Sequence, residues 1–210
     1  MGDKVRQLID DHLISKGVDP SIPPISITDA EFADHVVRQK SKRAQASEME
    51  HALRYHIRKH LQEDPVYYES LSERLAEILS ELRDRWDELI EALKEFVQEV
   101  QEGRQQDDTG LDPETQAPFL GVLRQEAVGD GEISPEDLIK LCRATVELVE
   151  HVQQEISVVE FWSRAQAQAD LRRWIFQYLD DQNVLPFDKL EEVADRLVQL
   201  GKGNHEKLTQ

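Results

Sequence analysis

The chain has few of the residues that build covalent or metal-held frameworks, and it has no long apolar run. Its 210 residues include one cysteine, Cys142, which excludes an internal disulfide and a zinc site built on several thiolates. No stretch approaches the roughly 18 consecutive apolar residues of a membrane helix. Near the N-terminus, Leu8 and Ile9 run directly into Asp10 and Asp11, unlike the apolar core of a secretion signal. We therefore predict a cytoplasmic protein that contacts no membrane.

The sequence also lacks the short motifs of common catalytic centres. It contains neither a GxxxxGK[ST] phosphate-binding loop nor a GxSxG nucleophile elbow. Cys142 falls on an apolar helical stripe, where a cysteine is more often a packing residue than a nucleophile. We predict no catalytic residue, no cofactor, no small-molecule substrate and no enzymatic activity of the chain alone. An enzyme in its own right is kept only as a third hypothesis.

Positive charge is scarce and unevenly placed. The chain has 25 Lys and Arg against 43 Asp and Glu, a net charge of −18. Residues 38–59 carry seven basic residues and two acidic ones, so this segment is about +5 and the remainder about −23. The candidate contact residues in this segment are Lys40, Lys42, Arg43, Arg54, Arg58 and Lys59. If they face one way, they predict a surface for an acidic partner protein or for DNA phosphates. Tyr55 is the only aromatic residue among them, which argues against stacking on single strands.

Apolar residues at helical spacing are what the sequence does contain. They predict a short helix over 5–13 that ends near Gly17, followed by an extended, Pro-rich segment over 17–25. Thr28 and Glu31 have the spacing of a capping box, which predicts an unbroken helix from 29 to about 63. Asp64-Pro65, Asp112-Pro113 and Ser134-Pro135 each predict a further helix start.

Two longer apolar stripes follow a heptad spacing. The first covers 71–100 and has one extra step between Leu82 and Trp86, which indicates a stutter in one helix or a bend between two; we favour the bend. The second covers 138–159, and a connection of about 35 residues joins the two. We therefore predict an all-α, multi-helix bundle with two long heptad-patterned helices packed antiparallel and no sheet. Two amphipathic helices, around Leu171–Leu179 and after Pro186, complete it.

The predicted organisation has three parts. Residues 1–103 form an N-terminal helical part, 104–134 a polar connection with one short helix, and 135–210 a C-terminal helical part that packs on the first. The polar run from 101 to 113, which includes Asp107-Asp108-Thr109-Gly110, marks the boundary.

Two arrangements resemble metal sites but have simpler interpretations. His56 and His60 are four residues apart on a predicted helix, yet no nearby carboxylate or cysteine obviously completes a site. Residues 126–137 resemble part of a calcium-binding loop, but Val128 stands where an oxygen ligand is needed. A turn before a capped helix accounts for the second pattern. We predict no metal site.

Several motifs, in the same order along nearly the whole chain, resemble one family: the C-terminal region of the R subunit of type I restriction enzymes. The motifs that carry the resemblance are Val5–His12, Ile22–Ser26, Ala46–Ile57, Glu63–Glu69 with Leu71–Leu75, Thr109–Pro113 with Ala117–Phe119, Asp180-Asp181, Leu185–Phe187 and Ala194–Val198.

The resemblance implies a function that the composition does not. In that family the whole R subunit has a nuclease domain and an ATP-driven motor, and a helical region joins them to the methyltransferase and specificity subunits. The chain lacks the nuclease and motor motifs, so the resemblance implies a non-catalytic assembly domain in defence against foreign DNA. The alternative hypothesis is a helical module that contacts duplex DNA through the basic helix 38–60.

Overall fold

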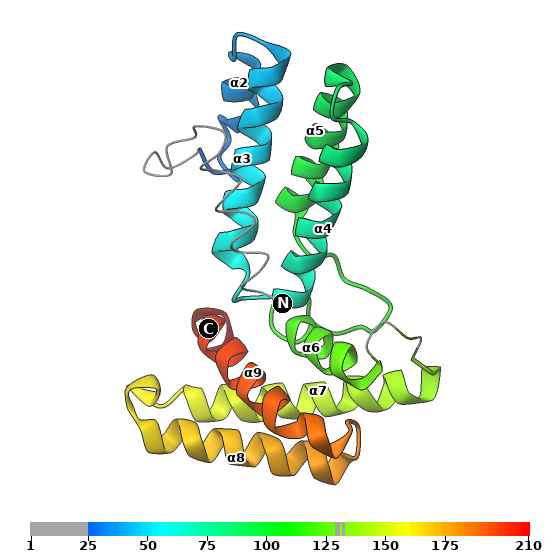
Figure 1. The fold of residues 1–210 in the computed structure, drawn as a ribbon. Coiled ribbons are helices and arrows are strands. Elements are labelled where there is room, and N and C mark those ends of the chain that lie inside the picture. Colours follow the sequence, from blue (N-terminus) through cyan, green and yellow to red (C-terminus); the bar gives the residue numbers. More distant parts are fainter. Residues whose placement is uncertain (1–24, 129–130, 132) are drawn as a thin grey trace. The chain divides into compact units, whose positions relative to one another are not determined.

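The computed structural model of the chain describes residues 25–128, 131 and 133–210, and every regular element in these residues is a helix (Figure 1). This confirms the predicted all-α class. The predicted helix over 5–13 and the Pro-rich segment up to residue 24 lie outside the described residues. None of the described helices combines the length and the apolar composition that crossing a membrane requires.

The chain divides into two compact units. The described part of unit 1 comprises residues 25–59 and 71–103, and unit 2 comprises 60–70 and 104–210. Residues 60–70, which the sequence analysis assigned to the N-terminal part, thus cluster with unit 2. The predicted packing of 135–210 on the N-terminal part stays a prediction.

Unit 1 is built from helices α2 to α5. Their bounds are Phe32–Val37 for α2, Lys42–His60 for α3, Pro65–Glu81 for α4 and Trp86–Glu102 for α5, with the first turns of α4 grouped with unit 2. Asp64 begins α4 as predicted, because its Oδ1 accepts a hydrogen bond from the amide of Tyr67 at 3.2 Å.

The unbroken helix predicted from 29 to about 63 is wrong, because the chain turns at residues 38–41. Ser41 Oγ accepts a hydrogen bond from the amide of Ala44 at 3.2 Å, so a serine side chain starts α3 anew. The predicted capping box is also absent, since no side chain caps α2 and Thr28 Oγ1 lies 2.7 Å from Ser26 Oγ. The break gives α2 its own orientation, in which Phe32 and Val36 are buried.

The stripe over 71–100 falls on two helices, which confirms the bend. α4 ends at Glu81 and α5 begins at Trp86, so the extra step in the heptad spacing coincides with the turn between them. Leu75 and Leu93 are almost fully buried, whereas Trp86 is 37% exposed at the start of α5. The buried residues on the two helices are Leu71, Leu75, Leu89, Ile90, Leu93, Phe96, Val97 and Val100.

Unit 2 contains one extended hydrophobic core. Its helices are α6 (Ala117–Val128), α7 (Pro135–Ile156), α8 (Ala165–Gln182), α9 (Leu190–Gly203) and α10 (His205–Leu208), with short 3-10 turns at Phe161–Ser163 and Phe187–Lys189. Helix α6, in the segment predicted as a polar connection, places Phe119 and Leu123 fully inside this core. It starts four residues later than Asp112-Pro113 suggested, after a turn over 113–116.

Helix α7 uses a wider face than the predicted heptad. Thr145, Val149 and Val152 are buried as the spacing requires, but Leu141 and Leu148 are buried beside them. The face is wide because α7 packs against both α6 and α8. The helix ends at Ile156, so Val159, predicted as the last heptad residue, is 79% exposed.

Candidate interaction sites

The six basic residues proposed as a contact surface do not share one face of α3. Lys40 lies in the turn before the helix, and Lys42 and Lys59 lie at its two ends on different sides. Arg43, Arg54 and Arg58 share one flank by helical spacing. Arg54 is largely covered and its Nε is 3.1 Å from Glu50 Oε1, so its charge is already matched.

The N-terminal end of α3 is the part of this segment where positive charge is most exposed. Lys40, Lys42 and Arg43 are all exposed there, and the first turn of α3 contains no acidic residue. Lys42 Nζ lies 2.5 Å from Asp87 Oδ1 of α5. Cations at a helix N-terminus are disfavoured by the helix dipole, which prefers acidic side chains at that end.

The surroundings of His51, in the middle of α3, favour the neutral form of its imidazole. Burial lowers the pKa of its imidazole, and the charge of Arg58 lowers it further, while Glu48 acts in the opposite direction. Of the histidine pair considered as a metal site, His56 and His60, the second takes part in a structural contact.

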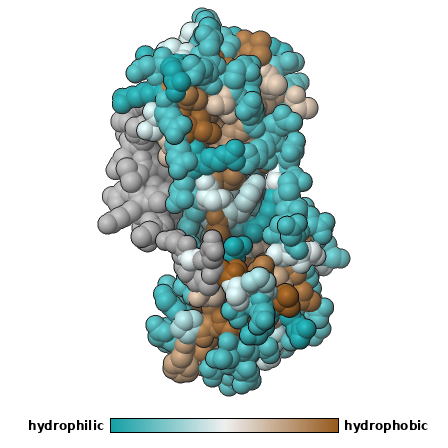
Figure 2. Space-filling view, turned by 90° about the vertical axis from the view of Figure 1, so that its right-hand side faces the viewer, coloured by the Kyte–Doolittle hydropathy of each residue, from teal (hydrophilic) through white to brown (hydrophobic). Residues whose placement is uncertain are grey.

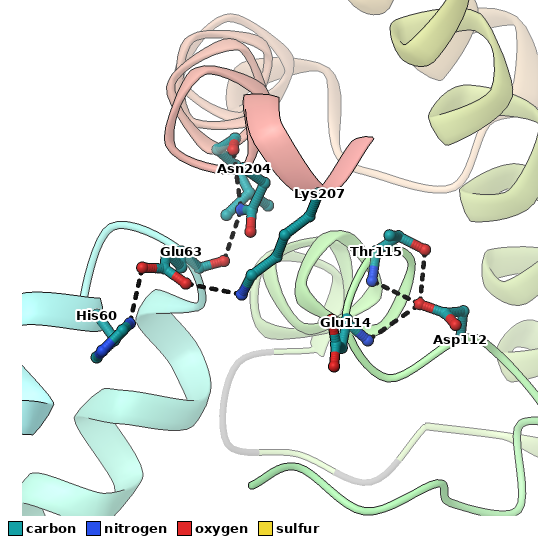
Figure 3. A network of polar contacts seen from close by, with 8 residues as sticks. His60, Glu63, Asp112, Glu114, Thr115, Asn204 and Lys207 are labelled. Carbon is teal, nitrogen blue, oxygen red and sulfur yellow. Dashed lines mark hydrogen bonds and ion pairs between the residues drawn. The ribbon is translucent and has the colours of Figure 1, made fainter. Parts of the chain in front are cut away.

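His60 belongs to a polar network that attaches residues 60–70 to the end of the chain within unit 2 (Figure 3). Glu63 is its centre: one carboxylate oxygen is 2.7 Å from His60 Nδ1 and the other is 2.7 Å from Lys207 Nζ. The Asn204 amide donates to the backbone oxygen of Glu63 at 2.7 Å. The interactions with Lys207 and His60 hold the pKa of the Glu63 carboxyl below its ordinary value, although burial acts to raise it.

Two further contacts strengthen this attachment. Asp64 is 5% exposed, and its Oδ2 lies 2.5 Å from Arg104 Nη1, while the Arg104 guanidinium also stands over the ring of Tyr67. Gly203 approaches the chain so closely that an added Cβ would lie 2.6 Å from the backbone oxygen of Gln62. Of this group the sequence pointed to Asp64, by its proline neighbour, and to His60, as half of a histidine pair; no pattern predicted that Glu63, Arg104, Asn204 and Lys207 would contact them.

The calcium-like pattern is used to start α7. Ser134 Oγ accepts from the Asp137 amide at 3.1 Å and donates to the Asp137 carboxylate at 2.8 Å. The Ser134 hydrogen bond lowers the pKa of the Asp137 carboxyl, and Lys140 adds to this. Asp130 and Glu132 lie outside the described residues.

The remaining candidate side chains have packing functions in the described structure. Burial raises the pKa of the Cys142 thiol, and the nearby Asp107 charge raises it further, which disfavours the nucleophilic thiolate. Within the described ranges, no three His, Cys, Asp or Glu side chains gather in a way that could hold a metal ion.

The described residues form an all-helical structure in which Glu63, His60 and Asp64 are engaged in ion pairs and Asp137 in a helix cap. A family model described as "Type I restriction enzyme HindI endonuclease subunit-like, C-terminal" matches residues 1–201, and the chain belongs to this family. The resemblance inferred from the motifs is thereby confirmed. No curated protein and no solved structure matches the chain.

Proposed function

We infer that the chain is the non-catalytic assembly domain of a type I restriction-modification R subunit, linking its motor and nuclease to the methyltransferase and specificity subunits in defence against foreign DNA. The observation that carries this function is the family match, which covers 201 of the 210 residues and assigns them to the C-terminal part of an endonuclease subunit. A cytoplasmic location, and the absence of a cofactor or a small-molecule substrate, belong to the same proposal.

Two features of the described residues support a docking function. Polar side chains that could have served chemistry, such as Glu63 and His60, are engaged in contacts between segments of the chain. Hydrophilic side chains predominate on the face shown in Figure 2, with hydrophobic patches between them. Large apolar side chains that are more than 60% exposed include Ile139, Val159 and Phe187 of unit 2. Apolar side chains of this kind supply contact area that a docking partner buries.

The direct test is binding of the chain to the methyltransferase and specificity subunits of its own restriction system. We expect a stoichiometric complex in size-exclusion chromatography at micromolar concentrations. Binding should weaken as salt is raised, because complementary charge contributes to the orientation and rate of docking. An unrelated acidic protein of similar net charge is the control for non-specific attraction. A folded chain, verified by circular dichroism, that forms no complex would exclude the proposal.

The non-catalytic part of the proposal has its own test. ATPase and nuclease assays of the chain alone should give no signal above buffer. A robust activity that one point mutation abolishes would contradict it.

A further inference from the structure

The turn between α8 and α9, within unit 2, exposes an aromatic ring. Phe187 begins the 3-10 turn Phe187–Lys189, and its side chain is 69% exposed. Leu185 and Leu190, on either side of Phe187, are buried in the core and hold the turn in place. The Phe187 ring meets that of Phe176 of α8 edge to face, with a centroid distance of 6.0 Å. Phe187 therefore presents apolar surface that the turn itself does not require.

Carboxylates flank this pair of rings on both elements. Asp180 lies one turn after Phe176 on the same flank of α8, and Asp188 directly follows Phe187. Both aspartates are exposed, and neither forms an ion pair with another described residue. Residues 180–192 contain five acidic residues and one basic one. The exposed ring thus lies in a strongly acidic segment.

The basic residues closest to this segment do not neutralise it. Each of them already has an acidic partner: Arg172 pairs with Glu191 and Asp195, Arg173 with Asp170, and Lys189 with Glu126. Since none of these partners is Asp180 or Asp188, the charges of these two carboxylates stay uncompensated among the described residues.

The end of α8 is an unfavourable place for acidic residues. Its last turn carries Asp180 and Asp181 and no basic residue. The free carbonyl groups at a helix C-terminus carry partial negative charge, so a cation there is stabilising and a carboxylate is not. Asn183 ends the helix in a left-handed conformation and adds no positive charge. A positively charged group from a partner would offset this repulsion.

We propose that the Phe187 ring, with the Asp180 and Asp188 carboxylates beside it, receives an arginine-bearing basic segment of a partner protein. A guanidinium group stacks on an aromatic ring while its N–H groups donate hydrogen bonds to carboxylates. The same carboxylates repel an acidic segment and the phosphates of DNA. The proposal rests on the docking function inferred above, and it adds a surface on unit 2 and the chemistry of the segment that binds there.

The first test is calorimetric titration of the chain with the methyltransferase and specificity subunits of its own restriction system. Phe187→Ser should weaken the complex at least about fivefold, as expected for the loss of an aromatic anchor. Asp180→Asn/Asp188→Asn should weaken it about three- to tenfold and reduce its dependence on salt, because two charges that attract the partner are removed.

Each variant has a matched control in unit 2. Ile139→Ser alters another apolar side chain that is 63% exposed, and Glu150→Gln/Glu206→Gln removes two exposed carboxylates elsewhere. Both controls should bind within about twofold of wild type. Circular dichroism verifies that every variant is folded.

A second measurement does not need the other subunits. Fluorescence anisotropy compares labelled hexa-arginine and hexa-lysine peptides, each titrated with the chain at about 20 mM salt, where screening is weak. Wild type should bind hexa-arginine about two- to fivefold more tightly, since a guanidinium stacks on a ring more favourably than an ammonium group does. Phe187→Leu keeps an apolar side chain but should remove this preference, whereas Ile139→Ser should retain it.

The two measurements separate this proposal from the docking function. If the complex forms and the Phe187 and aspartate variants bind like their controls, docking stands and this surface is not its site. If wild type forms no complex but prefers hexa-arginine through Phe187, the docking function falls and the arginine site remains, for a different basic partner. Equal binding of the two peptides by wild type would overturn the site. A concentration-dependent dimer in sedimentation that Phe187→Ser abolishes would also overturn it and assign the patch to a second copy of the chain.

Discussion

The two units of this chain differ in how they balance charge. The described part of unit 1 has 15 acidic and 11 basic residues, a net charge of −4. Unit 2 has 24 acidic and 11 basic residues, a net charge of −13. The net negative charge of the chain is therefore distributed unequally: unit 1 is nearly balanced, whereas unit 2 is strongly acidic.

The units also differ in where their ion pairs lie. In unit 1, Lys42–Asp87 joins two helices with side chains that are 58% and 79% exposed. In unit 2, Asp64–Arg104 joins segments 40 residues apart with side chains that are 8% and 23% exposed. Water screens the first kind of pair strongly and the second much less. Polar contacts therefore contribute more to the assembly of unit 2, while unit 1 depends on its apolar stripes.

We expect the largest effects on stability from substitutions that create a cavity in the core of each unit. Leu93 and Leu148 are both fully buried, and each change to alanine should lower the free energy of unfolding by about 2–5 kcal/mol. Hydrogen exchange followed by mass spectrometry should show faster exchange mainly in α5 for Leu93→Ala and mainly in α7 to α9 for Leu148→Ala. Equal acceleration in both units by either variant would show that they unfold as one cooperative body.

A smaller effect is expected where residues 60–70 meet the end of α9. Gly203→Ala should lower the free energy of unfolding by about 1–3 kcal/mol, because the backbone oxygen of Gln62 cannot move away easily. Gly201→Ala is the matched control: its Cβ would be 3.2 Å from a methyl of Val152, which needs to move by only a few tenths of an ångström. The control should remain within about 1 kcal/mol of wild type, helped by the helix propensity of alanine. Thermal unfolding measures both, and equal losses would argue against the close approach.

The network at Glu63 should make stability depend on pH. Because its carboxyl pKa is lowered in the folded state, the contribution of Glu63 is complete above the ordinary glutamate pKa of about 4.3 and is lost as pH falls through the lowered value. Glu63→Gln should cost about 1 kcal/mol at pH 7 and progressively less below pH 4. Urea unfolding at pH 7, 5 and 3 tests this; a cost that stays constant with pH would exclude a charge contribution.

The smallest effect is expected for the exposed ion pair of unit 1. Lys42→Gln should change the free energy of unfolding by about 0.2–1 kcal/mol, with a smaller change at 1 M salt. A loss above about 2 kcal/mol would mean that unit 1 depends on polar contacts as much as unit 2, which would remove the difference between them.

Patterns within about ten residues predicted the helices well. Apolar spacing identified α4, α5, α7, α8 and α9, and Asp64 and Ser134 marked two helix starts that the structure confirms. The errors came from local competition that spacing cannot resolve. Ser41 could have continued a helix or capped a new one, and the burial of Phe32 and Val36 accompanies the second choice.

The sequence by itself determined that this chain is all-helical, because the period of its apolar residues matches one turn of helix and no alternating pattern competes with it. The tertiary structure decided which charges remain available for a partner. Arg83 and Arg104 each follow the end of a helix, yet Arg104 is paired with Asp64, 40 residues away, while Arg83 is exposed in the turn between α4 and α5. The reason is that burial and ion pairing depend on neighbours brought from elsewhere in the chain, which a linear pattern does not record.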